Sequence, residues 1–533
     1  MRHEATLLHD LPLLAAQRSP QSAALRDDAS SIRYEELVSE IHGFASALGA
    51  LRVDRGERVA IYLEKRREAV SASFGAPAHG AVFVPINPLL KAEQVAYILR
   101  DCGVRVLVTS NERLQALAQV LPGCPDLAHV IVVGASPLPS LKGDTIASHR
   151  WSEVLDAAAQ GGHRAIDTDT VAILYTSGST GKPKGVVLSH RNMVAGAKSV
   201  ASYLENRDSD VLLAALPLSF DAGFSQLTTA FHAGASVVLL NYLLPKDVVK
   251  AVAKHRVTGI TAVPPLWIQL TQVTWPPEVS GHLRYFANTG GRMPLEILTK
   301  LRALWPQAKP YLMYGLTEAF RATYLSPEEV DRRPDSIGKA IPNSEVLVLR
   351  ADGSPCDAGE PGELVQRGAL VAQGYWNDPV MTAERFRPLP GRERGLVLPE
   401  MAVFSGDTVR RDEQGFLYFI GRHDEMIKSS GYRISPNEVE EVLYATGLVG
   451  ECAAFGVPHQ TLGESVAVVV TAAAGTVLGI QHLQAVCRDK LPAYMVPARI
   501  ELRDGPLPRN ANGKIDRKSL SAELRRAAES AAT

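Results

Sequence analysis

Apolar and polar positions alternate with two different periods along residues 34–134 of the 533-residue chain. Stretches such as 34–51 and 90–103 repeat apolar residues three and four positions apart, which predicts amphipathic helices. Stretches such as 58–64 and 104–110 are short, apolar and rich in β-branched residues, which predicts buried strands. Strands that alternate with helices in this way predict βαβ units and a parallel sheet that is covered on both faces.

The pattern changes toward the carboxyl end. From about residue 337 to 423, short strands are interrupted by Pro, Gly, Asp and Asn at the spacing of an antiparallel β-subdomain. A new mixture of strands and helices begins near Asp424 and has the length of a small domain. We therefore predict an α/β protein with a large N-terminal domain over residues 1–423, which includes the β-subdomain. A small, mobile α+β domain is expected over residues 424–533.

Composition narrows the class of protein. A hydrophobic content of 46% favours a globular fold, and a net charge of −1 gives no reason to expect nucleic acid or an anionic membrane as a partner. No apolar run reaches the ~20 residues that span a bilayer. Five scattered cysteines without C-x-x-C spacing argue against a disulfide framework or a zinc site. A cytoplasmic enzyme is expected, and the sequence leaves open whether it is monomeric or a homodimer.

A loop rich in Gly, Ser, Thr and Lys lies between two predicted strands at residues 175–185, with the sequence YTSGSTGKPKG. Its glycines allow close approach of the backbone to a ligand, and its hydroxyls, lysines and free N–H groups can surround phosphate oxygens. Pro183 follows Lys182, so the loop is not the P-loop of nucleotide hydrolases. A flexible surface loop is the alternative, but such loops rarely hold paired lysines between strands. The predicted phosphate-binding residues are Thr176, Ser177, Gly178, Ser179, Thr180, Gly181, Lys182 and Lys184.

Two later strands end in glycine-containing turns, at residues 290–291 and 314–315. This arrangement fits a crevice at the carboxyl ends of parallel strands, where ligands bind in such sheets. Glu318 follows the second turn, and a carboxylate beside a triphosphate needs a cation, which predicts a Mg²⁺ site shared with Thr180. Asp407 is of the type that accepts hydrogen bonds from ribose hydroxyls. A surface glutamate and a turn aspartate are the simpler interpretations of these two residues.

Six segments, taken together, resemble the acyl-adenylate-forming superfamily, which includes acyl-CoA synthetases, adenylation domains of peptide synthetases and beetle luciferase. In chain order they are YTSGSTGKPKG, YGLTEA, GELVQRG, YWNDP, SGDTVRRDEQGFLYFIGRHDEMIKSSGYRISPNEVEEVL and LPRNANGKIDRKSL. The match covers nearly the whole chain. In such enzymes a carboxylate attacks the α-phosphate of ATP, giving acyl-AMP and pyrophosphate. The thiol of CoA or of a phosphopantetheine arm then displaces AMP to give a thioester.

The resemblance implies roles for the residues that match its motifs. Those at the nucleotide are Gly290, Gly291 and Tyr314 at the adenine, Thr317 at the α-phosphate, Glu318 at Mg²⁺, and Asp407 and Arg422 at the ribose. Lys514 matches the lysine of the first half-reaction, and Lys428 matches a lysine placed near the adenylate in the second. Asp424 lies at the hinge, and Gly431 lies where the pantetheine thiol passes.

Elementary chemistry agrees with the role of Lys514. Its compact cation can bridge a carboxylate and the α-phosphate, and so offset the charge that builds up as two anions approach. The surrounding Gly/Asn-rich loop allows the lysine to be delivered and withdrawn when the small domain rotates about Asp424. A solvated surface lysine is the alternative interpretation of both Lys514 and Lys428.

The resemblance also places an acyl pocket. Its predicted lining residues are Phe220, Asp221, Phe224, His232, Val263, Trp267, Asn288 and Thr289. Most are apolar or aromatic, which fits an organic acid of moderate size. Asp221 follows Phe220 as in relatives that activate amino acids, where the aspartate pairs with the substrate ammonium, but residues 223–225 depart from that pattern. A buried carboxylate needs an ammonium, a donor such as Ser219 or His232, or solvent.

Three functions remain open from the sequence. An acyl-CoA ligase that uses ATP, Mg²⁺ and CoA is favoured, because no carrier domain follows Thr533. An enzyme that activates an amino acid and loads it onto the phosphopantetheine arm of an acyl or peptidyl carrier protein is the second. A non-catalytic adenylate-binding protein is the third, and the presence of Lys514, Glu318 and Asp407 together argues against it.

Overall fold

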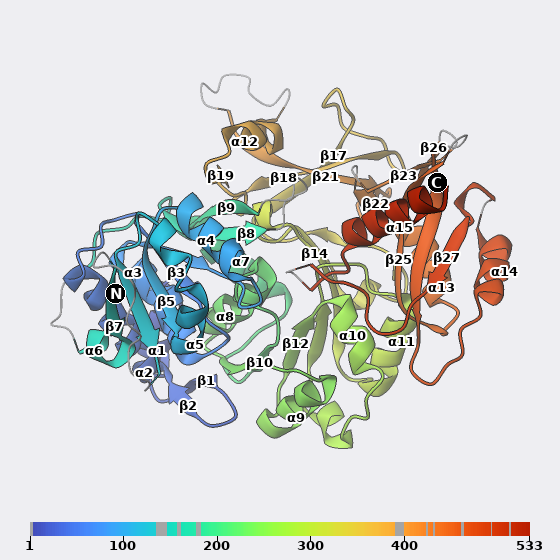
Figure 1. Cartoon of the computed structure of the whole chain (residues 1–533). Helices are drawn as coiled ribbons and strands as arrows, with labels where there is room; N and C mark the ends of the chain where they lie inside the picture. The colour runs from blue at the N-terminus through green and yellow to red at the C-terminus, as the bar shows by residue number, and fades with distance from the viewer. Residues whose placement is uncertain are drawn as a thin grey trace.

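The computed structural model describes residues 4–134, 146–156, 161–176, 183–389, 399–422, 425–429, 432–459, 463–491, 493–510 and 513–532. Within these residues the strands form four sheets. Figure 1 shows two large sheets with their helices, a smaller sheet above them, and a fourth sheet in a lobe formed by the C-terminal part of the chain. The mixed α/β class predicted from the sequence is confirmed.

The first sheet has eight strands in the order β19-β9-β8-β4-β3-β5-β6-β7. These strands are β3 (Arg58–Tyr62), β4 (Val82–Pro85), β5 (Val104–Ser110), β6 (His129–Val133), β7 (Ala147–Arg150), β8 (Thr170–Thr176), β9 (Lys184–Ser189) and β19 (Gly374–Tyr375). The helices of this part of the chain are α2 (Tyr34–Ala50), α3 (Arg67–His79), α4 (Ala92–Asp101), α5 (Asn111–Leu117) and α6 (Trp151–Leu155). Strands β3 to β6 are parallel, as the βαβ pattern predicts.

The second sheet has nine strands in the order β16-β15-β14-β13-β12-β10-β11-β1-β2. These strands are β1 (Ala23–Arg26), β2 (Ser31–Arg33), β10 (Val211–Ala214), β11 (Ser236–Leu239), β12 (Gly259–Ala262), β13 (Tyr285–Asn288), β14 (Lys309–Tyr314), β15 (Thr323–Leu325) and β16 (Lys339–Ala340). The helices of this part are α1 (Asp10–Arg18), α7 (His190–Tyr203), α8 (Asp221–Ala233), α9 (Pro245–His255), α10 (Pro264–Leu270) and α11 (Leu295–Leu304). Strands β10, β12, β13 and β14 run parallel.

Helix α8 includes a glycine because its first turn packs tightly on the preceding loop. A Cβ atom on Gly223 would lie only 1.8 Å from the carbonyl oxygen of Pro217. No other residue type fits this contact without movement of the backbone. The glycine that weakens the helical pattern in the sequence therefore fixes the position of the start of α8.

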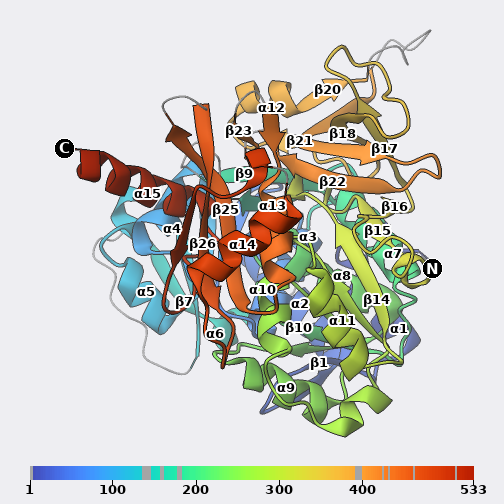
Figure 2. The same cartoon turned by 90° about the vertical axis from the view of Figure 1, so that its right-hand side faces the viewer.

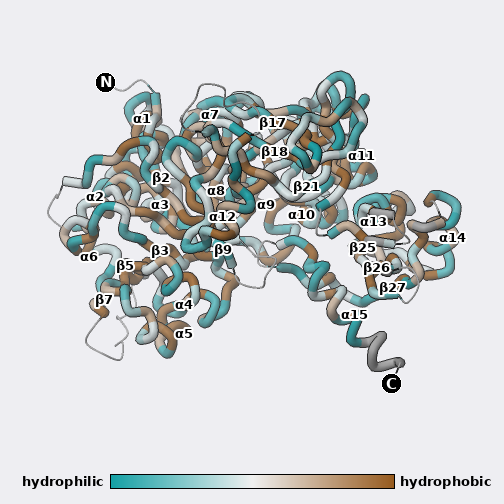
Figure 3. Tube along the Cα trace, turned by 90° about the horizontal axis from the view of Figure 1, so that it is seen from above, coloured by the Kyte–Doolittle hydropathy of each residue, from teal (hydrophilic) through white to brown (hydrophobic). Residues whose placement is uncertain are grey.

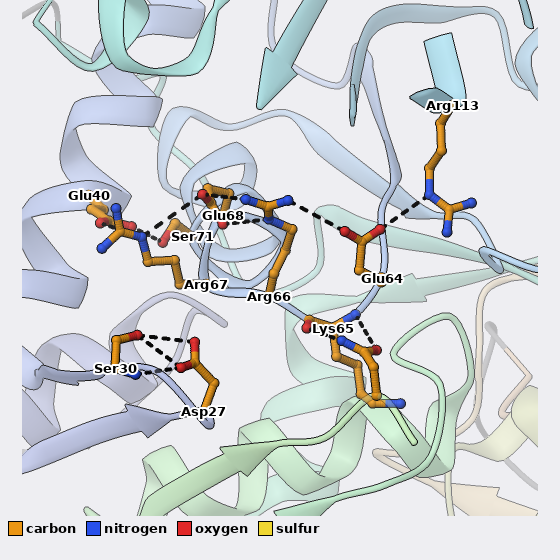
Figure 4. Close-up of polar contacts among 11 residues, drawn as sticks. Asp27, Ser30, Glu40, Glu64, Lys65, Arg66, Arg67, Glu68, Ser71 and Arg113 are labelled. Atoms are coloured by element: carbon orange, nitrogen blue, oxygen red, sulfur yellow. Dashed lines mark hydrogen bonds and ion pairs between the residues drawn. The ribbon is translucent and has the colours of Figure 1, made fainter. Parts of the chain in front are cut away.

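The loop after β3 joins the two large sheets. The backbone N–H of Lys65 donates to Asn241 Oδ1 at 3.1 Å, and Asn241 Nδ2 donates back to the Lys65 carbonyl at 2.7 Å. Lys65 Nζ donates to the carbonyl of Ala215 at 3.1 Å. Beside it, Arg66 pairs with Glu68 at 2.8 Å in a network of charged side chains (Figure 4).

The third sheet is the antiparallel β-subdomain that the sequence predicts. Its elements are β17 (Ser344–Leu349), β18 (Pro361–Gly368), β20 (Phe386–Pro388), β21 (Met401–Arg411), β22 (Leu417–Arg422) and helix α12 (Pro379–Arg385). The fourth sheet belongs to the C-terminal lobe. That lobe contains β23 (Ile427–Ser429), β24 (Tyr432–Ile434), β25 (Val449–His459), β26 (Gly463–Ala472), β27 (Arg499–Leu502), α13 (Pro436–Tyr444), α14 (Ile480–Lys490) and α15 (Arg517–Ala532). Figure 2 shows α15 extending away from the lobe.

The sheets change between Arg422 and Ile427. Asp424, the predicted boundary and hinge, lies outside the described residues, so the division at 423/424 stays a prediction. Apolar residues concentrate inside the layers and polar residues cover the outside (Figure 3). In the part of the chain that the structure describes, no helix is both long and apolar enough to cross a membrane.

Candidate active site

The crevice predicted from the sequence would lie at the carboxyl ends of β12, β13 and β14. These strands are parallel neighbours, so the turns at residues 290–291 and 314–315 lie at the same edge of the second sheet. The predicted position of both turns at the carboxyl ends of neighbouring parallel strands is confirmed. Gly290 adopts a φ of +74°, and a Cβ atom placed on it would lie 3.6 Å from Lys514 Cε. The C-terminal lobe therefore brings Lys514 to the end of the sheet, and Figure 1 shows its loop beside β14.

Lys514 enters a charged environment. Its side chain remains accessible to solvent, yet protein surrounds it closely, and the lost hydration lowers the pKa of its ammonium below the usual 10.5. The carboxylates of Asp221 and Asp407 oppose this effect, while the cation of Arg422 adds to it. The site thus combines a reachable ammonium with two acidic groups and a second cation.

Asp407 and Arg422 face each other across strands β21 and β22. Arg422 Nε lies 3.5 Å from Asp407 Oδ1, and the hydroxyl of Tyr314 donates to Asp407 Oδ2. Burial raises the pKa of Asp407, although Arg422, Tyr314 and Lys514 act in the opposite direction. Oδ1 receives no hydrogen bond from the described residues. A buried acceptor that has an ion-pair partner but no hydrogen bond suits an aspartate that receives a hydroxyl group from a ligand.

Glu318 follows the same edge of the sheet in a short 3₁₀ turn, η3 (Thr317–Ala319). The Tyr375 hydroxyl donates to Glu318 Oε1 at 2.6 Å, and Lys184 Nζ lies 5.8 Å from the centre of the Tyr375 ring. Thr176 and Lys184 are paired across β8 and β9, so the two ends of the predicted phosphate loop are adjacent. A carboxylate in this position suits Mg²⁺, which is commonly held by one or two carboxylates together with substrate phosphates.

Several predicted residues cannot be placed. Residues 177–182, Asp424 and Gly431 lie outside the described residues. The backbone of Lys428 is in strand β23, opposite Arg433, but its side chain is not described. The roles predicted for these residues therefore stay predictions.

The predicted acyl-pocket residues divide into two groups. Phe220 and Asp221 begin α8, and Val263 Cγ1 lies 3.1 Å from the Cβ position of Gly290. Asn288 ends β13, where its Nδ2 donates to the Gly291 carbonyl at 2.8 Å, and the buried Thr289 follows it. These five residues lie around the predicted crevice.

The other three side chains lie elsewhere. Phe224 stacks on Phe83 and Phe74 in the core, with ring centroids 4.9 Å and 5.6 Å apart. Trp267 is fully buried against Phe286 and Trp305.

His232 lies at the opposite end of α8 from Asp221, about 16 Å along the helix at 1.5 Å per residue. The structure therefore corrects the expectation that Phe224, Trp267 and His232 line the pocket. Aromatic residues near a site can equally belong to the core beneath it.

Asp221 has a partner that the sequence analysis missed. Arg321 Nη1 donates to Asp221 Oδ2 at 2.7 Å, and Thr317 Oγ1 donates to Asp221 Oδ1 at 3.3 Å. The expected donors, Ser219 and His232, do not fill this role. A lone arginine shortly after YGLTEAF carries no periodic signal, and only the tertiary structure shows that it meets the start of α8.

Comparison with known proteins gives a family. The model described as AMP-binding enzyme matches residues 14–376, and the model described as AMP-binding enzyme C-terminal domain matches residues 438–514. Among solved structures, the anthranilate CoA ligase AuaEII, in complex with anthranoyl-AMP, is 25% identical with a TM-score of 0.88. The similarity covers 99% of each chain.

Curated relatives differ in what they act on. L-proline--[L-prolyl-carrier protein] ligase of Pseudomonas fluorescens is 29% identical over 97% of this chain and 99% of its own length. Long-chain-fatty-acid--CoA ligase of Escherichia coli O157:H7 is 30% identical over 92% of this chain and 90% of its own. Tyrocidine synthase 3 of Brevibacillus parabrevis is 30% identical over 96% of this chain, which spans only 8% of that protein's length.

Proposed function

This chain belongs to the AMP-binding enzyme family of adenylate-forming ligases, and we propose that it activates a carboxylic acid with ATP and transfers the acyl group to CoA. The first step joins the carboxylate to the α-phosphate and releases pyrophosphate. In the second, the CoA thiol attacks the acyl carbon and AMP leaves. Each step breaks one bond and forms another, and neither step needs an oxidant or reductant.

The position of Lys514 is the observation that carries the proposal. Its side chain lies against Gly290 at the carboxyl ends of the parallel strands, close to Asp221 and Asp407. Two anions, a carboxylate and a phosphate, must approach each other in the first step. A preorganised ammonium offsets the repulsion between them and stabilises the charge that develops at the α-phosphate.

The neighbouring groups suit the nucleotide. Asp407 Oδ1, which pairs with Arg422 but receives no hydrogen bond from the described residues, would accept the ribose hydroxyls. Tyr314, Gly290 and Gly291 would contact the adenine. Thr317 would contact the α-phosphate, and the loop from Thr176 to Lys184 would hold the other phosphates. Glu318, together with Thr180, would hold Mg²⁺, which neutralises phosphate charge when it is bound.

The second step needs Lys514 to withdraw, because its loop occupies the end of the crevice that a thiol must reach. We propose that the C-terminal lobe rotates about Asp424. The rotation would bring Lys428 toward the adenylate and open a path for the pantetheine arm beside Gly431. Hinge rotations of this kind exchange one face of a small domain for another.

Loading of an amino acid onto a carrier protein is the second candidate. The full-length similarity to the prolyl-carrier protein ligase favours it. The contact between Asp221 and Arg321 argues against it, since the aspartate that would receive a substrate ammonium is already paired.

Acid-dependent exchange of pyrophosphate into ATP tests the proposal. Fatty, aryl, short-chain and amino acids would be supplied separately with MgATP, and the active acid would then be combined with CoA or with a holo carrier protein. We expect exchange with a non-amino acid and a thioester with CoA. Exchange with amino acids alone, or transfer to the carrier alone, supports the second candidate, and no exchange with any acid supports a non-catalytic binding protein.

A further inference from the structure

Arg321 is a buried cation with an unused donor at the proposed acyl pocket. The residue is only 2% exposed. Nη1 donates to Asp221 Oδ2 at 2.7 Å and to the Phe320 carbonyl at 3.2 Å. Nε is also buried, and no described residue accepts a hydrogen bond from it. An unpaired buried N–H is costly and suggests a ligand group that accepts the bond.

The backbone directs this side chain into the site. Phe320 adopts a φ of +55°, which is unfavourable for a residue with a side chain. Its ring packs on Gly196, where a Cβ atom would lie 2.4 Å from the ring. The next residue, Arg321, is held by Gln366 Nε2, which donates to its carbonyl at 2.8 Å. A strained residue kept in place by close packing is typical of a segment that positions a functional group.

A small cavity lies beside the guanidinium. Its volume is about 20 Å³, enough for one water-sized group. Its lining is mainly apolar, and its polar groups include those of Arg321, Ser225, Gln226, Thr229 and Thr261. The hydroxyls of Ser225 and Thr229 lie 3.4 Å apart. The cavity therefore suits a compact substituent with one oxygen atom directed at the guanidinium and these hydroxyls, and it leaves no room for a long chain.

The charges around the cavity determine which substituent of the acid it can bind. Asp221 already offsets the charge of Arg321 and lies within electrostatic reach of Lys514. An ammonium would add a third cation around one carboxylate and could not accept the bond from Nε. A neutral hydroxyl or oxo group could accept this bond without adding charge.

On the basis of the proposed function, we infer that Arg321 selects a short hydroxy or oxo acid and rejects the corresponding amino acid. The unpaired Nε donates to the oxygen of the substituent, while the reacting carboxylate lies toward Lys514. Arg321 is thus a specificity-determining residue that the motifs of the family do not reveal in this sequence.

Pyrophosphate exchange with matched acids tests this inference. Three- and four-carbon acids would carry at C2 or C3 a hydroxyl, an oxo group, an ammonium or no substituent. We expect the wild type to prefer a hydroxy or oxo acid over its amino analogue by roughly tenfold or more in kcat/KM. Arg321→Met should abolish or reverse this preference, because it removes the donor and leaves Asp221 unpaired.

Two variants separate selection from stability. Arg321→Lys keeps the charge and loses Nε, so it should still reject amino acids but lose most of the preference for the hydroxyl over an unsubstituted acid. If Arg321→Met fails to fold, the acid preference of Arg321→Lys tests the inference. Arg284→Met is the matched control. Arg284 pairs with the buried Asp210 at 2.5 Å and directly precedes β13, so it lies at the amino-terminal ends of the strands, away from the site at their carboxyl ends. This variant should lower stability without changing the acid preference.

The outcomes separate this inference from the proposed function. Preference of the wild type for an amino acid, for a long-chain acid or for a dicarboxylic acid overturns the inference and leaves carboxylate activation intact. An unchanged preference in both Arg321 variants also overturns it. Absence of exchange with every acid overturns both proposals.

Discussion

Replacing Lys514 by methionine should separate the two half-reactions. The substitution keeps a side chain of similar length and removes the ammonium, while the Cε atom that carries it lies 3.6 Å from the Cβ position of Gly290. A charge pair about 4 Å apart at an effective dielectric constant of ~20 is worth about 4 kcal/mol. At roughly 1.4 kcal/mol per tenfold change in rate, this corresponds to a loss of up to ~10³-fold. Because solvent reaches Lys514, we expect a loss of ~10² to 10³-fold in adenylate formation.

The assay measures each half-reaction alone. Pyrophosphate exchange reports adenylate formation, and thioester formation from supplied acyl-AMP and CoA reports the second step, which should change by no more than about threefold. Lys490→Met is the control, because Lys490 is a 66% exposed lysine of the same lobe, and neither step should respond. Equal losses of both steps in Lys514→Met, or unchanged exchange, would refute the role of this lysine.

Three other measurements follow from the same structure. Because burial lowers the pKa of Lys514 below 10.5 and only its protonated form carries charge, adenylate formation should fall as the pH rises through that pKa. Lys514→Arg should shift this alkaline limb upward, and an unchanged limb would contradict the assignment. Arg517→Met removes the cation that lies 2.7 Å from the carboxylate of Glu440, a residue that is only 7% exposed. Denaturant titration should show that the free energy of unfolding falls by about 3 kcal/mol. A fall below ~0.5 kcal/mol would count against a buried ion pair. Burial lowers the pKa of Lys65 to about 8, so above that pH the unfolded chain binds more protons than the folded chain. The free energy of unfolding should therefore rise with pH between pH 8 and 10.5, and this rise should be absent in Lys65→Met. Identical slopes of this free energy against pH in the two proteins would show that Lys65 is hydrated.

The sequence predicts well those features that depend on local pattern. The βαβ order, the antiparallel β-subdomain and the two glycine turns at the ends of β13 and β14 are encoded in short windows, and the sheet pairing agrees with each. Lys514 is found from its motif, although only the fold shows that its loop reaches Gly290. Features that depend on distant contacts are harder to predict. The partner of Asp221 is Arg321, 100 residues later in the chain.

The misplaced pocket residues have a shared physical cause. Phe224 and Trp267 lie close in sequence to pocket positions, but each side chain points into the core. Phe224 is three residues after Asp221 on α8, yet its ring lies against Phe74 and Phe83, so spacing along the helix does not by itself predict which side chains reach the pocket. His232 was assigned by its chemistry, yet it lies three turns further along the helix. Burial in the tertiary structure, rather than residue type, separates the core from the pocket.

Transfer of oxygen from the acid to AMP tests the central claim most directly. The active acid would be labelled with ¹⁸O in its carboxyl group and incubated with the protein, MgATP and CoA, and the products would be analysed by mass spectrometry. The carboxylate oxygen that bonds to the α-phosphate stays there when the thiol displaces AMP. We predict one ¹⁸O in AMP, one in the thioester carbonyl and none in pyrophosphate. Unlabelled AMP, or label in inorganic phosphate, would contradict activation through an acyl-adenylate.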